Sequence, residues 1–238
     1  MPDHYERGNR LLDALPTERR LRLSADLHVV AVERREHASD PGEHYYWVDF
    51  PIDAVYSIVA SGRNGELAEV GTVGREGFVP AQLAVGASVE RRTTSCQIGG
   101  RVARMPVDAF RHALERDPLF HELACRNVDA RLFAAEQLNA CNLMHTVMER
   151  VARWLLTTRD RVGRDEFPLT HDFLAAMLGV RRAGVTQAAG LLHQAEAIAY
   201  RRGQVTVQNA ARLEERACDC YRAIREVYET ALGLRVLA

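Results

Sequence analysis

Glycine and proline are distributed very unevenly along this chain of 238 residues. Nine of the 16 glycines fall between residues 42 and 100, whereas no glycine occurs from 101 to 162 and no proline from 119 to 167. Both residues mark turns and interrupt helices, so a long stretch without them favours continuous helix. We therefore expect a turn-rich sheet early in the chain and long helices in its middle.

The early part contains six short β-prone runs separated by turn sequences such as DPGE, SGRNGE and GREG. The runs are LHVVAV from residue 27, HYYWV from 44, AVYSIVA from 54, LAEVGTV from 67, RTTSCQI from 92 and RVARM from 101. This spacing predicts an antiparallel roll or barrel. Short helices are expected before it, one capped by Asn9 and one after Pro16.

A long helix is expected from Pro118 to Met144. One face of it is weakly apolar, and its residues recur at near-heptad spacing, namely Leu119, Leu123, Ala130, Phe133 or Ala134, Gln137 and Cys141. The helix packs either on its own domain or on its copy in a homodimer. We favour the homodimer, because a long helix that leaves a small β-domain has few partners in its own chain. A core-facing amphipathic helix with Val147, Val151, Trp154 and Leu155 follows.

Residues 168–193 have the pattern of two short helices joined by a turn. Thr170 can cap the first helix, Gly179 ends it, and the second is expected over 181–193. One side of the second helix is apolar, with Val185, Ala188, Ala189 and Leu192, and the other carries Arg182, Ala183, Thr186, Gln187, Gly190 and His193. This layout is typical of a helix-turn-helix whose second helix enters the DNA major groove. The alternative is a small α/β packing unit with a solvated arginine pair.

The two arginines at the start of this helix have different expected roles. Arg182 lies on the polar ridge and can reach a guanine edge, whereas Arg181 is expected to be rotated toward the buried side, where it meets a phosphate or caps the turn. The following segment AIAY-RRG-QVTV predicts a hairpin whose tip, Arg201 and Arg202, contacts phosphates. The charge distribution also favours a polyanionic partner for the C-terminal part. Residues 141–238 carry 14 arginines against 11 acidic residues, whereas residues 1–140 carry 17 arginines against 21 acidic residues.

Several segments resemble a Crp/Fnr-type bacterial transcription regulator over nearly the whole chain. They are NRLLDALP, EVGTVGREGFV, QLNACNLMH, the run from RVARWLL to VTQAA, and YRRGQVTV with LEERACDCYR. The resemblance implies an α+β chain with three parts: a cyclic-nucleotide-binding-like antiparallel β-roll (jelly-roll-like) over 1–117, a dimerisation helix over 118–144 and a winged helix-turn-helix over 145–238. It also implies a homodimer on a palindromic operator, with RNA polymerase as a further partner.

The resemblance and the polar ridge together assign the DNA contacts. Base contacts are expected from Arg182, Ala183, Thr186 and Gln187, and backbone contacts from Thr170, Arg181, Gly184, Arg201 and Arg202. One departure from the family lies just before the predicted hairpin, which is the wing of the winged helix-turn-helix. Glu196 stands there in place of the usual glycine. We expect this glutamate to distort the entry to the wing.

The effector pocket departs from the family as well. Cyclic-nucleotide-binding members have a Gly-Glu step for the ribose, where this chain has Pro80-Ala81-Gln82. An Arg91-Arg92-Thr93-Thr94 segment can still supply groups to a phosphate. The candidate pocket residues are Gly77, Gln82, Arg91, Arg92, Thr93 and Thr94. A cyclic nucleotide is thus one candidate cofactor, and an unknown or absent effector is favoured over it.

Other functions are less well supported. The sequences G-x-S-x-G, H-E-x-x-H and G-x-x-x-x-G-K-[ST] are absent, so we do not expect an enzyme. Five cysteines without a signal peptide indicate free thiols in the cytoplasm, and no membrane-spanning run occurs. Cys218 and Cys220 form a C-x-C without a second pair at zinc spacing, so no metal site is expected. The surviving alternative is a ligand-binding, redox-sensing or metal-sensing module that acts through protein partners.

Overall fold

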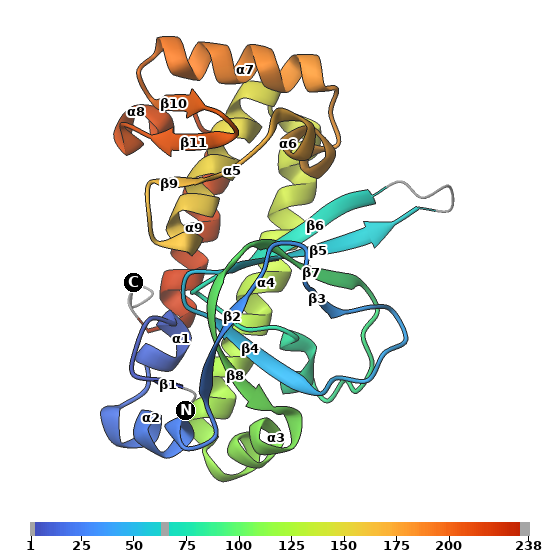
Figure 1. Cartoon of the computed structure of the whole chain (residues 1–238), viewed down its shortest axis with the longest axis vertical. Helices are drawn as coiled ribbons and strands as arrows, with labels where there is room; N and C mark the ends of the chain where they lie inside the picture. The colour runs from blue at the N-terminus through green and yellow to red at the C-terminus, as the bar shows by residue number, and fades with distance from the viewer. Residues whose placement is uncertain (1–2, 63–66, 234–238) are drawn as a thin grey trace.

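The structure is a computed structural model that describes residues 3–62 and 67–233. It has a β-roll with flanking helices at one end and a mostly helical part with a small sheet at the other, joined by one long helix (Figure 1). Among the described residues, no helix is both long enough and apolar enough to cross a membrane.

Two four-stranded antiparallel sheets form the roll, in the orders β1-β2-β8-β4 and β3-β7-β5-β6. Their strands are β1 (Asp3–His4), β2 (His28–Val32), β3 (His37–Ser39), β4 (Trp47–Pro51), β5 (Val55–Ser61), β6 (Leu67–Val73), β7 (Thr93–Ile98) and β8 (Gly100–Pro106). Five of the six predicted strands are confirmed close to their expected positions. The sixth prediction is wrong by three residues: His44 makes only an isolated bridge to Val89, and regular pairing with β8 begins at Trp47.

Phenylalanines join the roll to the helices on its flank. The ring centroids of Phe78 and Phe110 are 5.4 Å apart, and those of Phe110 and Phe120 are 5.6 Å apart. Phe78 belongs to the roll, whereas the other two lie on α3 (Val107–Arg116) and α4 (Pro118–Met144). Aromatic contacts of this kind add to the free energy gained by burying the rings. The start of the long helix is therefore fixed to the roll.

Asn9 caps α1 (Arg10–Asp13) as predicted, because its Oδ1 accepts a hydrogen bond from the backbone N–H of Leu12. The helix α2 (Thr17–Ser24) follows it. The side-chain amide of Asn9 is fully buried and donates to the carbonyl oxygens of Pro51 at 2.9 Å and Gly77 at 2.8 Å. One side chain thus caps α1 and connects this helix to the roll.

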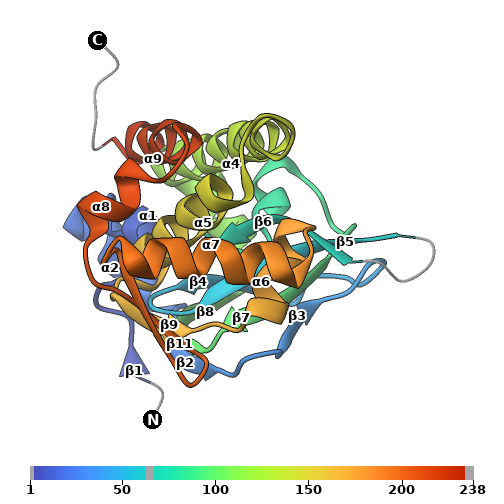
Figure 2. The ribbon, with the colours of Figure 1, turned by 90° about the horizontal axis from the view of Figure 1, so that it is seen from above.

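The long helix α4 has the predicted bounds, but its partner differs from the prediction. After the wing, the chain returns as α9 (Cys220–Ala231) and packs along α4, where Ala130 and Ala134 contact Ile224 and Tyr228 (Figure 2). The predicted dimer face is therefore largely buried inside its own chain, at Leu123, Ala130, Ala134 and Cys141. The expectation that α4 has few partners in its own chain is wrong, because that expectation did not include α9.

The C-terminal part contains a small helical core around a three-stranded sheet of order β10-β11-β9. Its elements are α5 (Val147–Val162), β9 (Glu166–Pro168), α6 (His171–Leu178), α7 (Arg182–Gln194), β10 (Ile198–Arg201), β11 (Gln204–Val207) and α8 (Ala210–Glu215). Thr146 caps α5 through a reciprocal pair of contacts with Glu149. Val55 and Ile98 of the roll belong to the same apolar cluster as this core. The roll and the C-terminal part therefore pack directly on each other.

A buried ion pair reinforces that contact. Arg161 on α5 places its Nε 2.7 Å from Oε1 of Glu76 in the roll, and the two side chains are only 9% and 7% exposed. Arg161 also donates to the hydroxyl of Thr72. Gly74 permits this approach, because a Cβ there would lie 2.4 Å from the Cβ of Arg161. The turn at residues 74–77 is thus fixed to the last turn of α5.

We expect Glu76→Ala to lower the free energy of unfolding by about 3–5 kcal/mol, because it leaves a buried guanidinium without its counter-charge. The matched control is Glu18→Ala, which breaks an ion pair with Arg22 whose side chains are 80% and 73% exposed. That change should cost less than about 1 kcal/mol. Urea unfolding of both variants measures the difference, and equal losses would contradict the role given to Glu76.

Candidate nucleic-acid interface

The two helices α6 and α7 form the predicted helix-turn-helix. Thr170 Oγ1 accepts a hydrogen bond from the backbone N–H of Phe173 at 3.2 Å, which caps α6. Gly179 ends the helix with φ of 62°, a left-handed conformation that glycine adopts without strain. Two residues, Val180 and Arg181, separate Gly179 from α7, which begins at Arg182. The sequence prediction of both helix ends is confirmed to within one residue.

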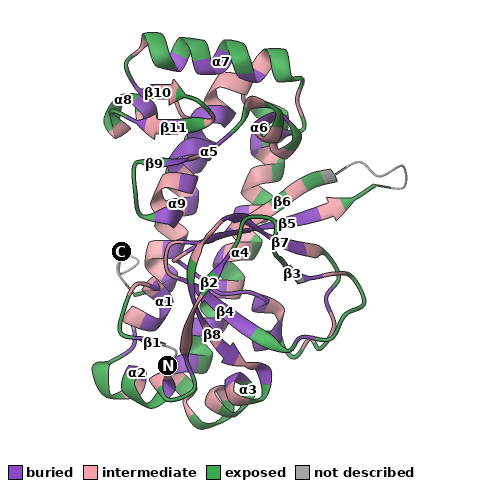
Figure 3. Ribbon diagram, viewed as in Figure 1, coloured by how far each residue is buried: buried purple, intermediate pink, exposed green. Residues whose placement is uncertain are grey.

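The helix α7 has one buried and one exposed face, as predicted (Figure 3). The buried residues are Val185, Ala188, Ala189 and Leu192, and they belong to the same core cluster as α5 residues. The predicted ridge residues Arg182, Ala183, Thr186, Gln187, Gly190 and His193 are exposed, and so are Leu191 and Gln194 near the end of the helix. In Figure 1, α7 lies across the end of the molecule farthest from the roll. The polar ridge is therefore open to a large partner.

Arg181 is the N-cap residue of α7, and its side chain makes no capping hydrogen bond. It is exposed, as Arg182 is. The expectation that Arg181 is rotated toward the buried side is wrong, because residue 181 precedes the helix and its extended backbone (φ −70°, ψ 140°) does not follow the helical wheel. Both arginines face solvent.

Two side chains of α6 contact the ridge, and the sequence reasoning did not identify them. Asp172 Oδ1 lies 3.3 Å from Arg182 Nε, and His171 Nδ1 lies 3.1 Å from Thr186 Oγ1. Partial burial and the positive charge of Arg182 lower the pKa of His171. The two charged side chains of the ion pair are about two-thirds exposed, 67% for Arg182 and 69% for Asp172. Such a pair contributes little to stability, so it orients Arg182 without removing it from the surface.

The wing forms the predicted hairpin, with Arg201 paired to Gln204 at its end. Arg202 and Gly203 at the tip both have positive φ, 49° and 78°, as in the tight turns that suit hairpins. Both tip arginines are exposed. The basic tip is therefore available for contact with a polyanion.

Glu196 does not distort the entry to the wing, so that expectation is wrong. It takes the left-handed conformation with φ of 55°, which a glycine would adopt at lower cost. The strands β10 and β11 nevertheless pair in regular register from Ile198 to Val207. The Glu196 carboxylate forms an ion pair with Arg212 on α8.

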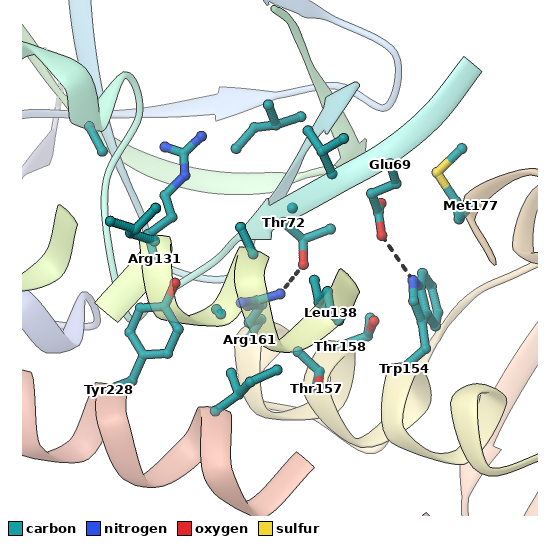
Figure 4. A pocket seen from close by; sticks show the side chains of 18 of the residues that line it. Glu69, Thr72, Arg131, Leu138, Trp154, Thr157, Thr158, Arg161, Met177 and Tyr228 are labelled. Carbon is teal, nitrogen blue, oxygen red and sulfur yellow. Dashed lines mark hydrogen bonds between the residues drawn. The ribbon is translucent and has the colours of Figure 1, made fainter. Parts of the chain in front are cut away.

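A cavity of about 460 Å³ lies where the roll meets α4, α5 and α9 (Figure 4). Of the six predicted effector residues, its lining includes only Gln82 and Arg92. Gly77 packs instead against the side-chain amide of Asn127. Thr94 is buried, with its hydroxyl 3.5 Å from the Glu90 carboxylate. The cavity therefore brings together two of the six predicted pocket residues, Gln82 and Arg92.

Glu90 binds the backbone of the loop at residues 91–94, the loop that was expected to bind an anion. Its Oε1 accepts hydrogen bonds from the backbone N–H groups of Arg91 at 2.7 Å and Arg92 at 3.0 Å. Its Oε2 accepts from the hydroxyls of Ser39 and Thr94, and the residue is only 2% exposed. Since the chain's own carboxylate uses these donors, they are not available to the phosphate of a ligand.

The cavity has a basic lining with one acidic group. Four arginines border it, Arg92, Arg131, Arg153 and Arg161. Burial lowers the pKa of Arg131. Burial also raises the pKa of Glu69, against hydrogen bonds from Ser57 at 2.7 Å and from the Trp154 indole at 3.1 Å that lower it (Figure 4). The cavity can hold a small polar or anionic molecule.

Comparison with known proteins identifies the domain that contains α6 and α7. Residues 149–216 match the Crp-like helix-turn-helix domain. No curated protein sequence matches the chain.

Solved structures match most of the chain. FixK2 from Bradyrhizobium japonicum has 16% identity and a TM-score of 0.65, over 81% of this chain and 98% of that one. A CRP-family regulator from Thermus thermophilus has 19% identity and a TM-score of 0.63, over 79% and 96%. The c-di-GMP-responsive regulator CLP from Xanthomonas campestris has 14% identity and a TM-score of 0.61, over 82% and 100%. The chain thus contains a Crp-like helix-turn-helix domain and has the overall fold of the Crp/Fnr transcription regulators.

Proposed function

We propose that this protein is a sequence-specific DNA-binding transcription regulator that acts as a homodimer. The observation that carries the proposal is the exposed polar ridge of α7 beside the basic wing tip. In this arrangement α7 enters the major groove and the β10–β11 hairpin contacts the backbone. Base contacts come from Arg182, Ala183, Thr186 and Gln187, and backbone contacts from Thr170, Arg181, Gly184, Arg201 and Arg202.

Arg182→Ala should weaken binding to a selected operator by about 1–3 kcal/mol and relax the preference at one base pair, because a bidentate contact to guanine is lost. Arg201→Ala should weaken binding to all sequences about equally and reduce its salt dependence. The control is Arg22→Ala on α2, far from the ridge, which should change neither property. Selection of binding sites from a random DNA library, followed by titration at two salt concentrations, measures both effects.

An Arg182→Ala variant with an unchanged base preference would contradict the placement of α7 in the groove. A folded chain that selects no sequence at all would instead support the alternative, a sensing module that acts through protein partners.

We propose that the dimer forms through the face of α4 opposite α9. Val128, Leu132 and Ala135 recur there at near-heptad spacing, outside the cluster that packs on α9. Leu132 is 58% exposed, and Leu143 near the end of the helix is 89% exposed. Exposed large apolar side chains on one long helix favour a second copy of that helix as their partner.

Leu132→Glu should convert the dimer to a monomer, because it places a charge in the centre of the apolar contact. Leu21→Glu is the matched control, since Leu21 is 63% exposed on α2, away from this face. Sedimentation equilibrium at micromolar concentration distinguishes the two states. An unmodified chain that sediments as a monomer would exclude the homodimer.

We further propose that an effector, where one acts, binds in the cavity that Arg92 and Arg131 line, and not at the backbone N–H groups of Arg91 and Arg92. Glu90 supports this proposal, since its carboxylate already accepts hydrogen bonds from those two N–H groups. A phosphate that used them would have to displace a buried carboxylate that also accepts from the hydroxyls of Ser39 and Thr94. That step costs free energy that phosphate binding must first offset.

We therefore expect cyclic AMP, cyclic GMP and cyclic di-GMP to leave the thermal unfolding midpoint unchanged. Cyclic di-GMP is included because the Xanthomonas regulator of similar fold responds to it. A ligand at 100-fold its dissociation constant adds about 2.7 kcal/mol, and each kcal/mol raises the midpoint by about 2–4 °C for a chain of this size. A rise of that size with any of the three nucleotides would overturn the expectation, and a rise that Arg131→Ala leaves unchanged would also place the ligand outside the cavity.

A further inference from the structure

Four metal-binding side chains that are far apart in the sequence meet at the joint between α4 and α5. Cys141 lies in the last turn of α4, and His145 follows that helix directly. Cys218 and Cys220 lie where the chain enters α9. The Sγ atoms of Cys141 and Cys218 are 3.5 Å apart, and Cys220 Sγ lies 3.7 Å from His145 Nδ1. All four potential ligand atoms lie within 4.8 Å of one another.

We propose that these four residues bind one zinc ion in tetrahedral geometry. With Zn–S bonds of about 2.3 Å and Zn–N bonds of about 2.0–2.1 Å, the ligand atoms of such a site lie about 3.5–3.8 Å apart. The two measured pairs fall in this range, so the remaining atoms need only small rotations. Three thiolates with one imidazole are a common ligand set of structural zinc sites.

The groups around the three cysteines favour metal-bound thiolates over neutral thiols. The side-chain amide of Gln137 donates to the Sγ of Cys220 at 3.1 Å, a contact that orients a thiolate ligand. Three thiolates and Zn²⁺ carry a net charge of −1, and the buried guanidinium of Arg153 lies beside Cys141 to balance it. Cys141, Cys218 and Cys220 are each at most 5% exposed, so the site is closed to solvent on the thiol side.

The site would join segments on both sides of the DNA-binding part. Only His145 and Thr146 separate α4 from α5, so this short joint sets the direction of α5 relative to the long helix. Cys218 and Cys220 belong to the segment that returns along α4 after the wing and α8. An ion held by both segments closes a loop of about 80 residues, which strongly restricts the unfolded chain. The proposal does not depend on DNA binding.

Zinc content tests the proposal directly. Protein purified under reducing conditions without chelator should contain about one zinc per chain, measured by mass spectrometry of the elements. Cys218→Ser and Cys220→Ser should each remove most of the zinc. Cys125→Ser is the matched control, because Cys125 lies on α4 outside the cluster, and it should retain the full content.

Cobalt substitution of the unmodified chain keeps the test valid if a cysteine variant fails to fold. Co²⁺ added to the metal-free protein should produce the intense visible bands of tetrahedral cobalt and a near-ultraviolet thiolate charge-transfer band. His145→Ala should alter the visible bands and leave the charge-transfer band present.

Two results would overturn the proposal. The first is a folded, reduced chain that holds neither zinc nor cobalt. The second is a zinc content that Cys125→Ser lowers as much as Cys218→Ser does.

Discussion

The ion pair between Glu76 and Arg161 joins the two halves of this molecule. Burying two charges costs several kcal/mol per ion, which is offset only where both are well hydrogen-bonded. Glu76 meets this condition, since its carboxylate also accepts from the backbone N–H of Gly74. The backbone of the same turn is held from two further directions: Asn9 donates to the carbonyl of Gly77, and Asn127 donates to that of Glu76 at 2.8 Å. Three distant segments, those of Asn9, Asn127 and Arg161, therefore meet at residues 74–77.

The direction of the exposed ridge of α7 follows from this junction. Arg161 lies in the last turn of α5, and the apolar face of that helix carries α7 through Val185 and Leu192. A second contact between the roll and α5 runs from Trp154 to Glu69. With two fixed points along α5, the helix has little freedom to rotate, so the exposed ridge of α7 has a defined direction relative to the roll.

The sequence predicted those features that depend on local rules. The two ends of α6 follow from a threonine cap and a terminal glycine, and the wing follows from a turn between two β-prone runs. The two faces of α7 follow from helical period alone. For these elements, the residues that decide the structure are neighbours in the sequence, and no tertiary contact overrides them.

Features that depend on long-range contact could not be predicted in this way. Cys141 and Cys218 are 77 residues apart, and no spacing rule relates them. The packing of α9 on α4 covers the face of α4 that was predicted to form the dimer contact. Glu90 was not considered as the partner of the loop that it precedes. The contact of Asp172 with Arg182 joins two different helices, and the periodicity of each helix alone does not predict it.

The long helix α4 is where the separate proposals meet. It lines the cavity through Arg131, carries the exposed Leu132 and holds Cys141 in its last turn. A ligand, a second copy of the chain and a metal ion would each contact this one element. Binding at one site alters affinity at another only if each partner favours one of two positions of the shared element, and the coupling is then reciprocal. The contact with α9 holds α4, and the Glu76–Arg161 pair holds the end of α5. Only His145 and Thr146 lie between the two helices, so a metal ion bound by Cys141 and His145 would act on the connection between them.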